Sequence, residues 1–331
     1  MSNSCRKIIV TAASFLDPPV GEPAGSQNAR NTLEAAAERH NLEIDYRCDR
    51  NPAYPLQPAE LADAVAVIAD LERYDEHLLQ QAGAAAGGCL RLIARYGTGY
   101  SSIDIDAARA CGVLVTNTPG ANTVPTAEWA LTTLLTVAGT SLLHHRRAAA
   151  GQPKSGTARL DLSGRTLGVV GTGSIGRQLI ELVGGFNFRA LGYDMYPDHR
   201  WAEEHQVEYV DLPTLCERSD FISLHASSPE TIITSSELSR MKPATVLVNC
   251  ARGHLVDNRA VYEAVKSGSL WGYGLDEVWE YPDLPLDDVN IVVSPHVGSD
   301  TDYGKDRMRT MSASSVAAFL DGETQRHVVN S

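Results

Sequence analysis

A glycine-rich turn constrains the fold of this chain more than any other feature. The string GTGSIG follows the apolar run TLGVV and precedes RQLIELVGG, which has helical periodicity. A strand, a tight glycine turn and a helix in this order are typical of the phosphate-binding corner of a dinucleotide-binding domain. We therefore predict that the backbone here binds a pyrophosphate at a helix N-terminus, through Gly171, Thr172, Gly173, Ser174, Ile175 and Gly176.

An acidic residue ends the next apolar run, FRALGYD. Asp194 lies at about the spacing where a carboxylate bonds the adenosine ribose hydroxyls in such domains. A carboxylate repels a 2′-phosphate, so the sequence favours NAD over NADP, although His199 and Arg200 just beyond could soften the discrimination. The alternative is that Asp194 only caps the following loop.

The rest of the chain alternates short β-rich runs with Ala/Leu-rich helical patterns. Such alternation predicts parallel sheets covered by helices on both faces. Two such series are present, which indicates two α/β units. A single long helix is expected from about Thr126 to Ala150, ended by Gly151-Gln152-Pro153. The expected strands are KIIVTAA, AVAVIAD, RLIARYG and GVLVTNT, then TLGVV, FRALGYD, VEYVDL, DFISLHA, TVLVNCA, WGYGLDE and NIVVSPH.

Length and charge narrow the class of protein. The 331 residues suffice for two domains of about 150 residues. Lys and Arg number 28 against 41 Asp and Glu, and this net charge of −13 disfavours nucleic acid and anionic membranes as partners. No stretch approaches about 18 uninterrupted apolar residues, and the start of the chain lacks a long apolar run. We expect a cytoplasmic protein without a membrane partner.

The cysteines and the histidine pair favour no metal site. The six cysteines are scattered without a C-x-x-C pair, so we expect reduced, mostly buried thiols and neither a disulfide framework nor a zinc site. His144 and His145 could be zinc ligands, but adjacent helical positions point to different sides, which favours a solvated face. The cysteines are Cys5, Cys48, Cys89, Cys111, Cys216 and Cys250.

Several strings together resemble the D-isomer-specific 2-hydroxyacid dehydrogenase family, which includes phosphoglycerate, hydroxypyruvate and phosphite dehydrogenases. They are IARYGTGYSSIDIDAARACGVLVTNTPGANTVPTAEWA, LSGRTLGVVGTGSIG, ELSRMKPATVLVNCARGHLVD and SPHVGS, and they cover most of residues 91–299. The resemblance implies an α/β fold of two Rossmann-like or flavodoxin-like parallel-sheet domains with an active-site cleft between them. Residues 1–120 and 300–331 would form the substrate-binding domain, and 121–299 an inserted NAD-binding Rossmann domain that also makes a homodimer contact.

The resemblance also implies roles for single residues. Arg252 matches the arginine that grips the carboxylate of a 2-oxo acid, and His296 matches the general acid/base. A structural arginine and a structural histidine are the alternatives. The substrate's carboxylate would also meet backbone amides of Gly97, Thr98 and Gly99. Residues near the cofactor would be His225, Ala226, Cys250 (as a contact, not a nucleophile) and Asp276, the last beside the nicotinamide carboxamide.

One position departs from the family pattern. Relatives have D-V-F-x-x-E-P, with the glutamate bonded to the catalytic histidine, whereas this chain has D-E-V-W-E-Y-P from Asp276. Tyr281 occupies the expected glutamate position and Glu280 lies one place early. Glu280 could pair with His296 after a one-residue shift, Tyr281 could offer its hydroxyl instead, or the histidine has no side-chain partner. Glu277 is expected to be solvated or a surface partner.

A second departure lies in the segment IADLERYDEHLL. Relatives commonly have small or hydroxylated residues and a cation there, whereas this chain has Asp70 and Glu72, and only Arg73 could contribute positive charge. A substrate with an extra phosphate is therefore disfavoured. We interpret the acids as part of a solvated helix start, with Asp75 and Glu76 at the N-terminus.

The leading hypothesis is an NAD-dependent oxidoreductase acting on a small anionic 2-hydroxy or 2-oxo acid, or on a phosphonate or sulfonate analogue. Hydride transfer would need the substrate held by Arg252 while His296 moves the proton. The rival from another class is an NAD(H)-sensing binding protein like the family's corepressors. A formate- or phosphite-type dehydrogenase would keep the chemistry and change the substrate.

Overall fold

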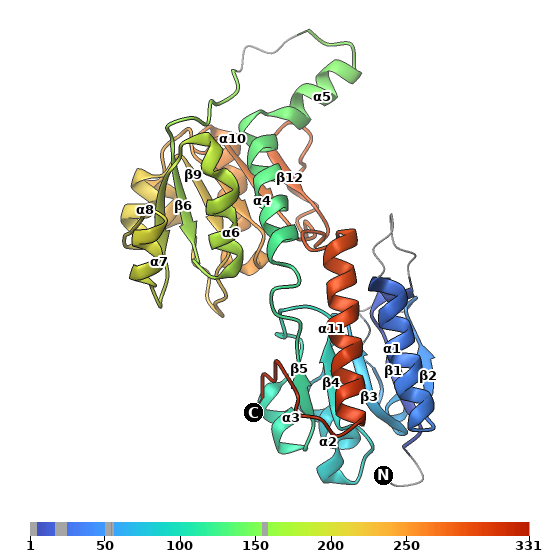
Figure 1. The fold of residues 1–331 in the computed structure, drawn as a ribbon. Helices are drawn as coiled ribbons and strands as arrows, with labels where there is room; N and C mark the ends of the chain where they lie inside the picture. Colours follow the sequence, from blue (N-terminus) through green and yellow to red (C-terminus); the bar gives the residue numbers. More distant parts are fainter. Residues whose placement is uncertain (1–4, 17–24, 50–53, 55, 154–157, 331) are drawn as a thin grey trace. The chain divides into compact units, whose positions relative to one another are not determined.

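The computed structural model describes residues 5–16, 25–49, 54, 56–153 and 158–330. Residues 1–4, at the start of the stretch that lacks a long apolar run, lie outside that range. The chain divides into two compact units, each described here by itself (Figure 1). Unit 1 comprises residues 1–122 and 300–331, and unit 2 comprises residues 123–299. None of the helices described has both the length and the apolar character to cross a membrane.

Unit 1 is built on a five-stranded parallel sheet in the order β2-β1-β3-β4-β5, which is the flavodoxin-like order. All six residues of β3 are buried, as expected for a parallel strand covered on both faces. The sequence pattern did not predict β2, because this edge strand, EIDY, is short and half acidic. The strands are β1 (Lys7–Val10), β2 (Glu43–Tyr46), β3 (Ala64–Ala69), β4 (Leu92–Arg95) and β5 (Leu114–Thr116).

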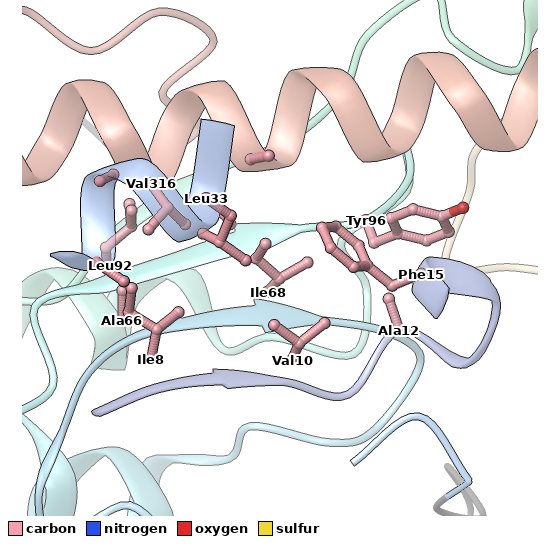
Figure 2. Close-up of a cluster of buried hydrophobic side chains, with 14 of the residues drawn as sticks. Ile8, Val10, Ala12, Phe15, Leu33, Ala66, Ile68, Leu92, Tyr96 and Val316 are labelled. Atoms are coloured by element: carbon pink, nitrogen blue, oxygen red, sulfur yellow. The ribbon is translucent and has the colours of Figure 1, made fainter. Parts of the chain in front are cut away.

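Helices cover both faces of this sheet. On one face α1 (Gly25–Arg39) and α11 (Asp302–Leu320) pack against each other, and α11 lies on β3 and β4. Figure 2 shows Leu33 of α1 and Val316 of α11 over Ile68 of β3. The second core cluster includes residues of α2 (Glu76–Ala82) and α3 (Ile105–Ala110). The short 3-10 helices are η1 (Ala13–Leu16), η2 (Pro58–Glu60) and η3 (Ala84–Ala86).

Unit 2 has a seven-stranded parallel sheet in the order β12-β11-β10-β9-β6-β7-β8. This is the Rossmann order extended by one strand, and the order reverses at β6, which pairs with β7 on one side and β9 on the other. The sequence predicted every one of these strands. They are β6 (Thr166–Val170), β7 (Arg189–Tyr193), β8 (Val207–Tyr209), β9 (Phe221–Leu224), β10 (Val246–Asn249), β11 (Gly272–Leu275) and β12 (Ile291–Val293).

The prediction of one long helix from Thr126 to Ala150 is wrong. The segment forms α4 (Thr123–Ala138) and α5 (Ser141–Ala149), separated at Gly139 and at Thr140, which has a left-handed φ of 48°. Glycine weakens a helix at this point, and the end of α4 is capped from the sheet. The Val137 carbonyl accepts from the Trp271 indole at 3.2 Å and from the Asn290 amide at 2.9 Å.

The remaining helices of unit 2 connect its strands (Figure 1). Of these, α6 packs against α4, whereas α9 contacts both α8 and α10. In Figure 1, α5 projects away from the sheet of unit 2, and none of its residues is buried. The helices are α6 (Ser174–Leu182), α7 (His199–Glu204), α8 (Leu212–Arg218), α9 (Ser235–Arg240) and α10 (Asn258–Ser267), with 3-10 helices η4 (Val183–Phe186) and η5 (Gly253–Leu255).

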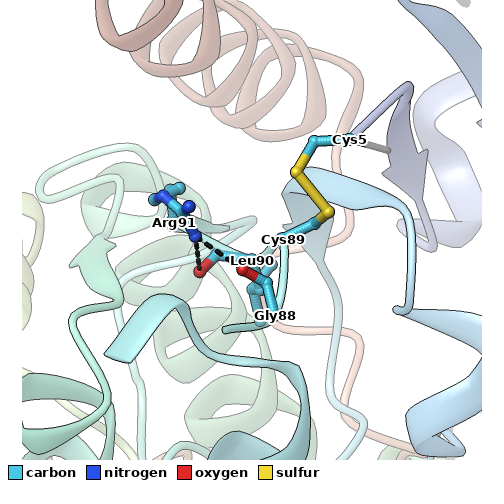
Figure 3. Close-up of a disulfide and its surroundings, with 5 residues drawn as sticks. All are labelled: Cys5, Gly88, Cys89, Leu90 and Arg91. Atoms are coloured by element: carbon cyan, nitrogen blue, oxygen red, sulfur yellow. Dashed lines mark hydrogen bonds between the residues drawn. A yellow bond between two sulfur atoms is a disulfide. The ribbon is translucent and has the colours of Figure 1, made fainter. Parts of the chain in front are cut away.

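A disulfide joins Cys5 to Cys89 in unit 1 (Figure 3), so the prediction that all six cysteines are free thiols is wrong for this pair. Both residues are buried, and their Cα atoms lie 5.3 Å apart. Each cysteine shortly precedes a strand, β1 or β4, whose amino end lies at the same edge of the sheet. The two cysteines are 84 positions apart in the sequence, so no local pattern indicates the pairing. The cysteines outside this disulfide are Cys48, Cys111, Cys216 and Cys250.

Candidate active site

The glycine turn of unit 2 has the geometry that a dinucleotide requires. Gly171 has a φ of 92°, and a Cβ there would lie 2.6 Å from the Ala226 nitrogen. A Cβ on Gly176 would lie 2.2 Å from the Gly171 carbonyl oxygen, so a side chain at either position would disrupt the packing of the turn. Gly173 has no such neighbour within 4 Å. Its backbone is therefore approachable at the N-terminus of α6, which begins at Ser174.

A cavity of about 500 Å³ opens beside this turn. Its lining comes from the carboxyl ends of β6, β7 and β9, where the strand order reverses and where open parallel sheets bind ligands. The size and the glycine cradle fit part of a dinucleotide. Among the lining residues are Gly171, Gly173, Asp194, Met195, Tyr196, His225 and Ala226.

Asp194 both lines the cavity and caps the loop that follows β7. Its Oδ2 accepts from the backbone N–H of Thr172 at 2.7 Å and from the Thr172 hydroxyl at 3.1 Å. Its Oδ1 accepts from the Tyr196 N–H at 2.9 Å. The two interpretations of Asp194 are therefore compatible, because the capping bonds hold the carboxylate at the wall of the cavity.

His225 and Cys250 form a neutral pair beside the cavity. The His225 Nδ1 lies 3.3 Å from the Cys250 Sγ, and Nε2 lies 2.9 Å from the Ser223 hydroxyl. Burial lowers the pKa of His225 to about 3, and burial followed by the charge of Asp276 raises the pKa of Cys250. Cys250 therefore remains a thiol at neutral pH, which supports a packing contact over a nucleophile.

Asp276 fixes the loop that carries His296. Its Oδ1 accepts from the Ser294 hydroxyl at 2.7 Å and from the Val297 N–H at 2.8 Å, and its Oδ2 accepts from the Gly298 N–H at 2.6 Å. The carboxylate is only 7 % exposed, so these bonds form away from water. Donors on both sides of His296 are thus tied to one side chain at the end of β11.

His296 itself has a left-handed backbone with a φ of 59°, which is uncommon for a residue other than glycine. Backbone conformations of this kind are concentrated at functional sites. Within the described part of the chain, its ring has no hydrogen-bond partner, and neither Glu280 nor Tyr281 bonds to it. Glu280 is exposed. The Tyr281 ring packs against that of Trp279, with centroids 5.1 Å apart, and under the Arg259 guanidinium at 5.4 Å.

Arg252 follows β10, at the same carboxyl edge of the sheet. Its carbonyl accepts from the Asn249 side-chain amide at 2.8 Å, and the next N–H, of Gly253, donates to Glu277 Oε2 at 2.7 Å. The expectation that Glu277 is solvated or a surface partner is therefore wrong, because consecutive side chains after β11 point to opposite sides and reach different loops. Asp276 holds the His296 loop, whereas Glu277 holds the Arg252 loop.

In unit 1 the segment Gly97–Gly99 follows β4. The Gly97 N–H donates to the Thr118 hydroxyl at 3.0 Å, whereas the N–H groups of Thr98 and Gly99 have no partner among the described residues. A Cβ on Gly97 would lie 3.0 to 3.1 Å from the guanidinium of Arg95. The sequence analysis considered Arg73 as the cation of the segment Ile68–Leu79 and did not consider Arg95, which lies two residues before the glycine loop.

The interpretation of Glu72 as part of a solvated helix start is also wrong. The residue is 1 % exposed, and its carboxylate accepts from the hydroxyls of Thr11 and Tyr74, the latter at 2.8 Å, and from the Asp70 N–H at 3.3 Å. Asp75, in contrast, does begin α2, where its carboxylate accepts from the Leu78 N–H at 3.0 Å. The signal that marks Glu72 is its place three residues after the fully apolar strand β3.

His144 and His145 lie on α5, where the His144 Nδ1 is 3.3 Å from the Thr140 hydroxyl. Across the residues that the structure describes, no three His, Cys, Asp or Glu side chains cluster in a way that could hold a metal ion. In unit 2 the candidate site consists of the glycine turn and of the two loops that Asp276 and Glu277 hold.

Comparison with known proteins also indicates an NAD-binding dehydrogenase. Residues 131–298 match the model of the D-isomer specific 2-hydroxyacid dehydrogenase NAD binding domain. The chain is 39 % identical to a glyoxylate reductase of Korarchaeum cryptofilum over 73 % of its own length and 76 % of that protein. It is 37 % identical to a D-3-phosphoglycerate dehydrogenase of Methanocaldococcus jannaschii, over 73 % of this chain and 48 % of the relative.

A solved structure agrees in fold. The TT0316 protein of Thermus thermophilus superposes with a TM-score of 0.78 and 30 % identity, covering 98 % of this chain and 99 % of the other. The predicted fold class, two parallel-sheet α/β domains, is confirmed. With NAD as its cofactor and oxidoreduction as its activity, this chain belongs to the D-isomer specific 2-hydroxyacid dehydrogenase family.

Proposed function

We propose that the chain interconverts a small 2-hydroxy acid and the corresponding 2-oxo acid, with His296 as general acid/base and Arg252 as the anchor of the substrate carboxylate. The observation that carries this proposal is the clamp of Asp276 on the His296 loop. At the same edge of the sheet as the nucleotide cavity, it presents an imidazole to which no described residue is hydrogen-bonded. A purely structural histidine would have its ring satisfied by neighbours.

Each residue of the proposed site would have its own role in the reaction. When bound, the nicotinamide supplies or accepts the hydride. The planar guanidinium of Arg252 would hold the carboxylate, with help from the N–H groups of Thr98 and Gly99 in unit 1. His296 would donate a proton to the carbonyl oxygen in reduction and take it back in oxidation. A phosphonate or sulfonate could take the place of the carboxylate, because it offers the same anionic oxygens.

We further propose Glu280 as the partner of His296. Tyr281 is engaged by Trp279 and Arg259, and Arg259 is itself held by Asp283 at 2.8 and 3.0 Å, whereas Glu280 is exposed and without a partner in the described chain. Hydrogen bonds of an active site often tighten only when substrate is bound. For reduction, Glu280→Gln should move the alkaline limb of kcat/KM to lower pH, and Tyr281→Phe should not. The opposite result would assign the role to Tyr281.

Three wider features of the family carry over as proposals. We propose a homodimer through unit 2, since α5 buries none of its residues within the chain. We also propose a cytoplasmic location and assign unit 1 to substrate binding and unit 2 to NAD binding. A measured molar mass in solution tests the dimer directly.

A second candidate, an NAD(H)-sensing protein without turnover, is favoured by the missing acidic partner, because Tyr281 occupies the position where relatives carry the glutamate and no carboxylate of the described residues bonds to the His296 ring. One experiment separates the two: the purified protein with NADH is screened by absorbance against glyoxylate, pyruvate, hydroxypyruvate and 2-oxoisocaproate, with formate and phosphite tested with NAD⁺. Turnover of a 2-oxo acid is expected. Tight NADH binding with no turnover of any compound would favour the sensor.

A further inference from the structure

The peptide bond between Arg252 and Gly253 is held on both of its sides. The Arg252 carbonyl accepts from the Asn249 amide at 2.8 Å, and the Gly253 N–H donates to Glu277 at 2.7 Å. The next carbonyl, of Gly253, accepts from the Asn258 amide at 3.1 Å. The plane of this peptide is therefore set by side chains from two separate segments, the end of β10 and the stretch after β11, and the peptide that follows it is held by a side chain at the start of α10.

Glu277 is the charged member of this set and has an unusual place. It directly follows Asp276, and the two carboxylates hold the two loops that carry the proposed catalytic residues. A Cβ on Gly253 would lie 3.2 Å from Glu277 Oε2, so the glycine lets the carboxylate approach the backbone closely. Because both acids leave the same short stretch of chain, a displacement of that stretch would move Arg252 and His296 together.

We propose that Glu277 is a positioning residue that fixes the direction of the Arg252 side chain by binding the Gly253 N–H. This inference rests on the proposed role of Arg252. With the peptide plane fixed, the Arg252 side chain leaves the backbone in one direction, in which its Nη1 donates to the Ala251 carbonyl at 2.7 Å and its other N–H groups can meet the substrate carboxylate. Without the acceptor the peptide can rotate, and the guanidinium must be ordered again each time substrate binds.

The test compares variants by their steady-state kinetics with the best 2-oxo acid of the screen. Glu277→Leu removes the acceptor and should raise KM for the oxo acid about tenfold, with the dissociation constant of NADH unchanged. Glu277→Gln keeps an amide oxygen able to accept from Gly253 and should restore KM to within about twofold of the wild type. Glu263→Leu, at an exposed glutamate of α10, is the matched control and should leave KM unchanged.

A double-mutant cycle separates positioning from general disturbance. In an Arg252→Ala background, Glu277→Leu should have no further effect on KM, since there is no guanidinium left to direct. A full additional tenfold rise in that background would overturn the proposal, and so would Glu277→Gln behaving like Glu277→Leu. Should the wild type turn over no oxo acid while binding NADH, the proposed function fails first, and this outcome is recognised before any variant is made.

Discussion

The carboxyl edges of the two sheets carry polar groups in opposite ways. In unit 1 the polar groups bond one another: Glu72 is buried beneath three donors, and Arg95 donates to the carbonyls of Tyr96 and Ala69. In unit 2 the carboxylates of Asp276 and Glu277 bind backbone N–H groups of the loops that carry His296 and Arg252. The His296 ring has no hydrogen-bond partner in the described chain, and the Arg252 guanidinium donates to the neighbouring Ala251 carbonyl at 2.7 Å. The polar side chains at the first edge stabilise the fold, whereas the two acids at the second edge hold loops that present other side chains.

The largest expected effect is on catalysis in unit 2. His296→Gln should lower kcat by about 10² to 10⁴-fold, because the proton that the carbonyl oxygen needs is no longer supplied by a positioned donor. The free energy of unfolding should change by less than about 0.5 kcal/mol, since the ring makes no hydrogen bond within the described chain. Steady-state kinetics and urea unfolding measure the two quantities.

His145→Gln, at an exposed position of α5, provides the control for that variant and should leave both quantities unchanged. If His296→Gln instead lost stability while keeping most of its activity, the contrast between the two edges would not hold. The histidine would then be a structural residue of the second sheet.

Unit 2 could be predicted from sequence in more detail than unit 1, for a physical reason. Its glycines at 171, 173 and 176 are required by backbone geometry, and such requirements appear directly as residue types at fixed spacing. What could not be predicted there is the partner of a side chain that reaches a distant loop. Glu277 and Gly253 are 24 residues apart, and no local pattern states that the carboxylate bonds that backbone N–H.

In unit 1 the next largest effect concerns the disulfide. Closing a loop between cysteines that are 84 positions apart removes unfolded-state entropy, so Cys5→Ser should lower the free energy of unfolding of unit 1 by about 2 to 4 kcal/mol. NADH binding in unit 2 should be unchanged. Urea unfolding with and without a thiol reductant measures the loss, and the reductant should lower the stability of the wild type but not of the variant.

Counting thiols provides an independent check on this bond. Wild-type protein denatured without reductant should show four titratable thiols, those of the cysteines outside the disulfide. Six would mean that the bond is absent in solution, and the core of unit 1 (Figure 2) would then be held by apolar packing alone.

A slightly smaller effect is expected from Glu72. Glu72→Leu removes the buried acceptor shared by the hydroxyls of Thr11 and Tyr74 and the Asp70 N–H. The Thr11 hydroxyl can still donate to the Ile68 carbonyl and the Asp70 N–H to the Thr11 oxygen, so the loss should cost about 1 to 3 kcal/mol of unfolding free energy. Glu38→Leu, at an exposed position of α1, is the control and should cost less than about 0.5 kcal/mol. An activity loss in Glu72→Leu without a stability loss would mean that this edge also has a catalytic task.

The sequence missed these features of unit 1 because they depend on tertiary pairing. The strand EIDY lacks the apolar run of a buried strand, since it lies at the edge of the sheet. Glu72 stands in an acidic segment that is typical of a helix start, although the residue is buried. Cys5 and Cys89 become neighbours only after β1, β3 and β4 have paired in that order. Burial and partners in this unit follow from topology, which no short motif states.

The smallest expected effect returns to unit 2 and tests whether its edge is free of structural groups. The pKa of His225 is lowered to about 3 by burial, whereas in the unfolded chain an imidazole has its ordinary value near 6.5. As pH falls below that ordinary value, the unfolded state binds a proton that the folded state does not, so stability is lost. Between pH 7 and pH 5 the loss should be about 1 to 2 kcal/mol, measured by urea unfolding across pH.

The control is a pair of variants. His225→Gln should remove this part of the slope of unfolding free energy against pH, and His145→Gln should not. If the slope survives in His225→Gln, the histidine is protonated in the folded state, and its pairing with Ser223 and Cys250 is weaker than the distances of 2.9 and 3.3 Å imply.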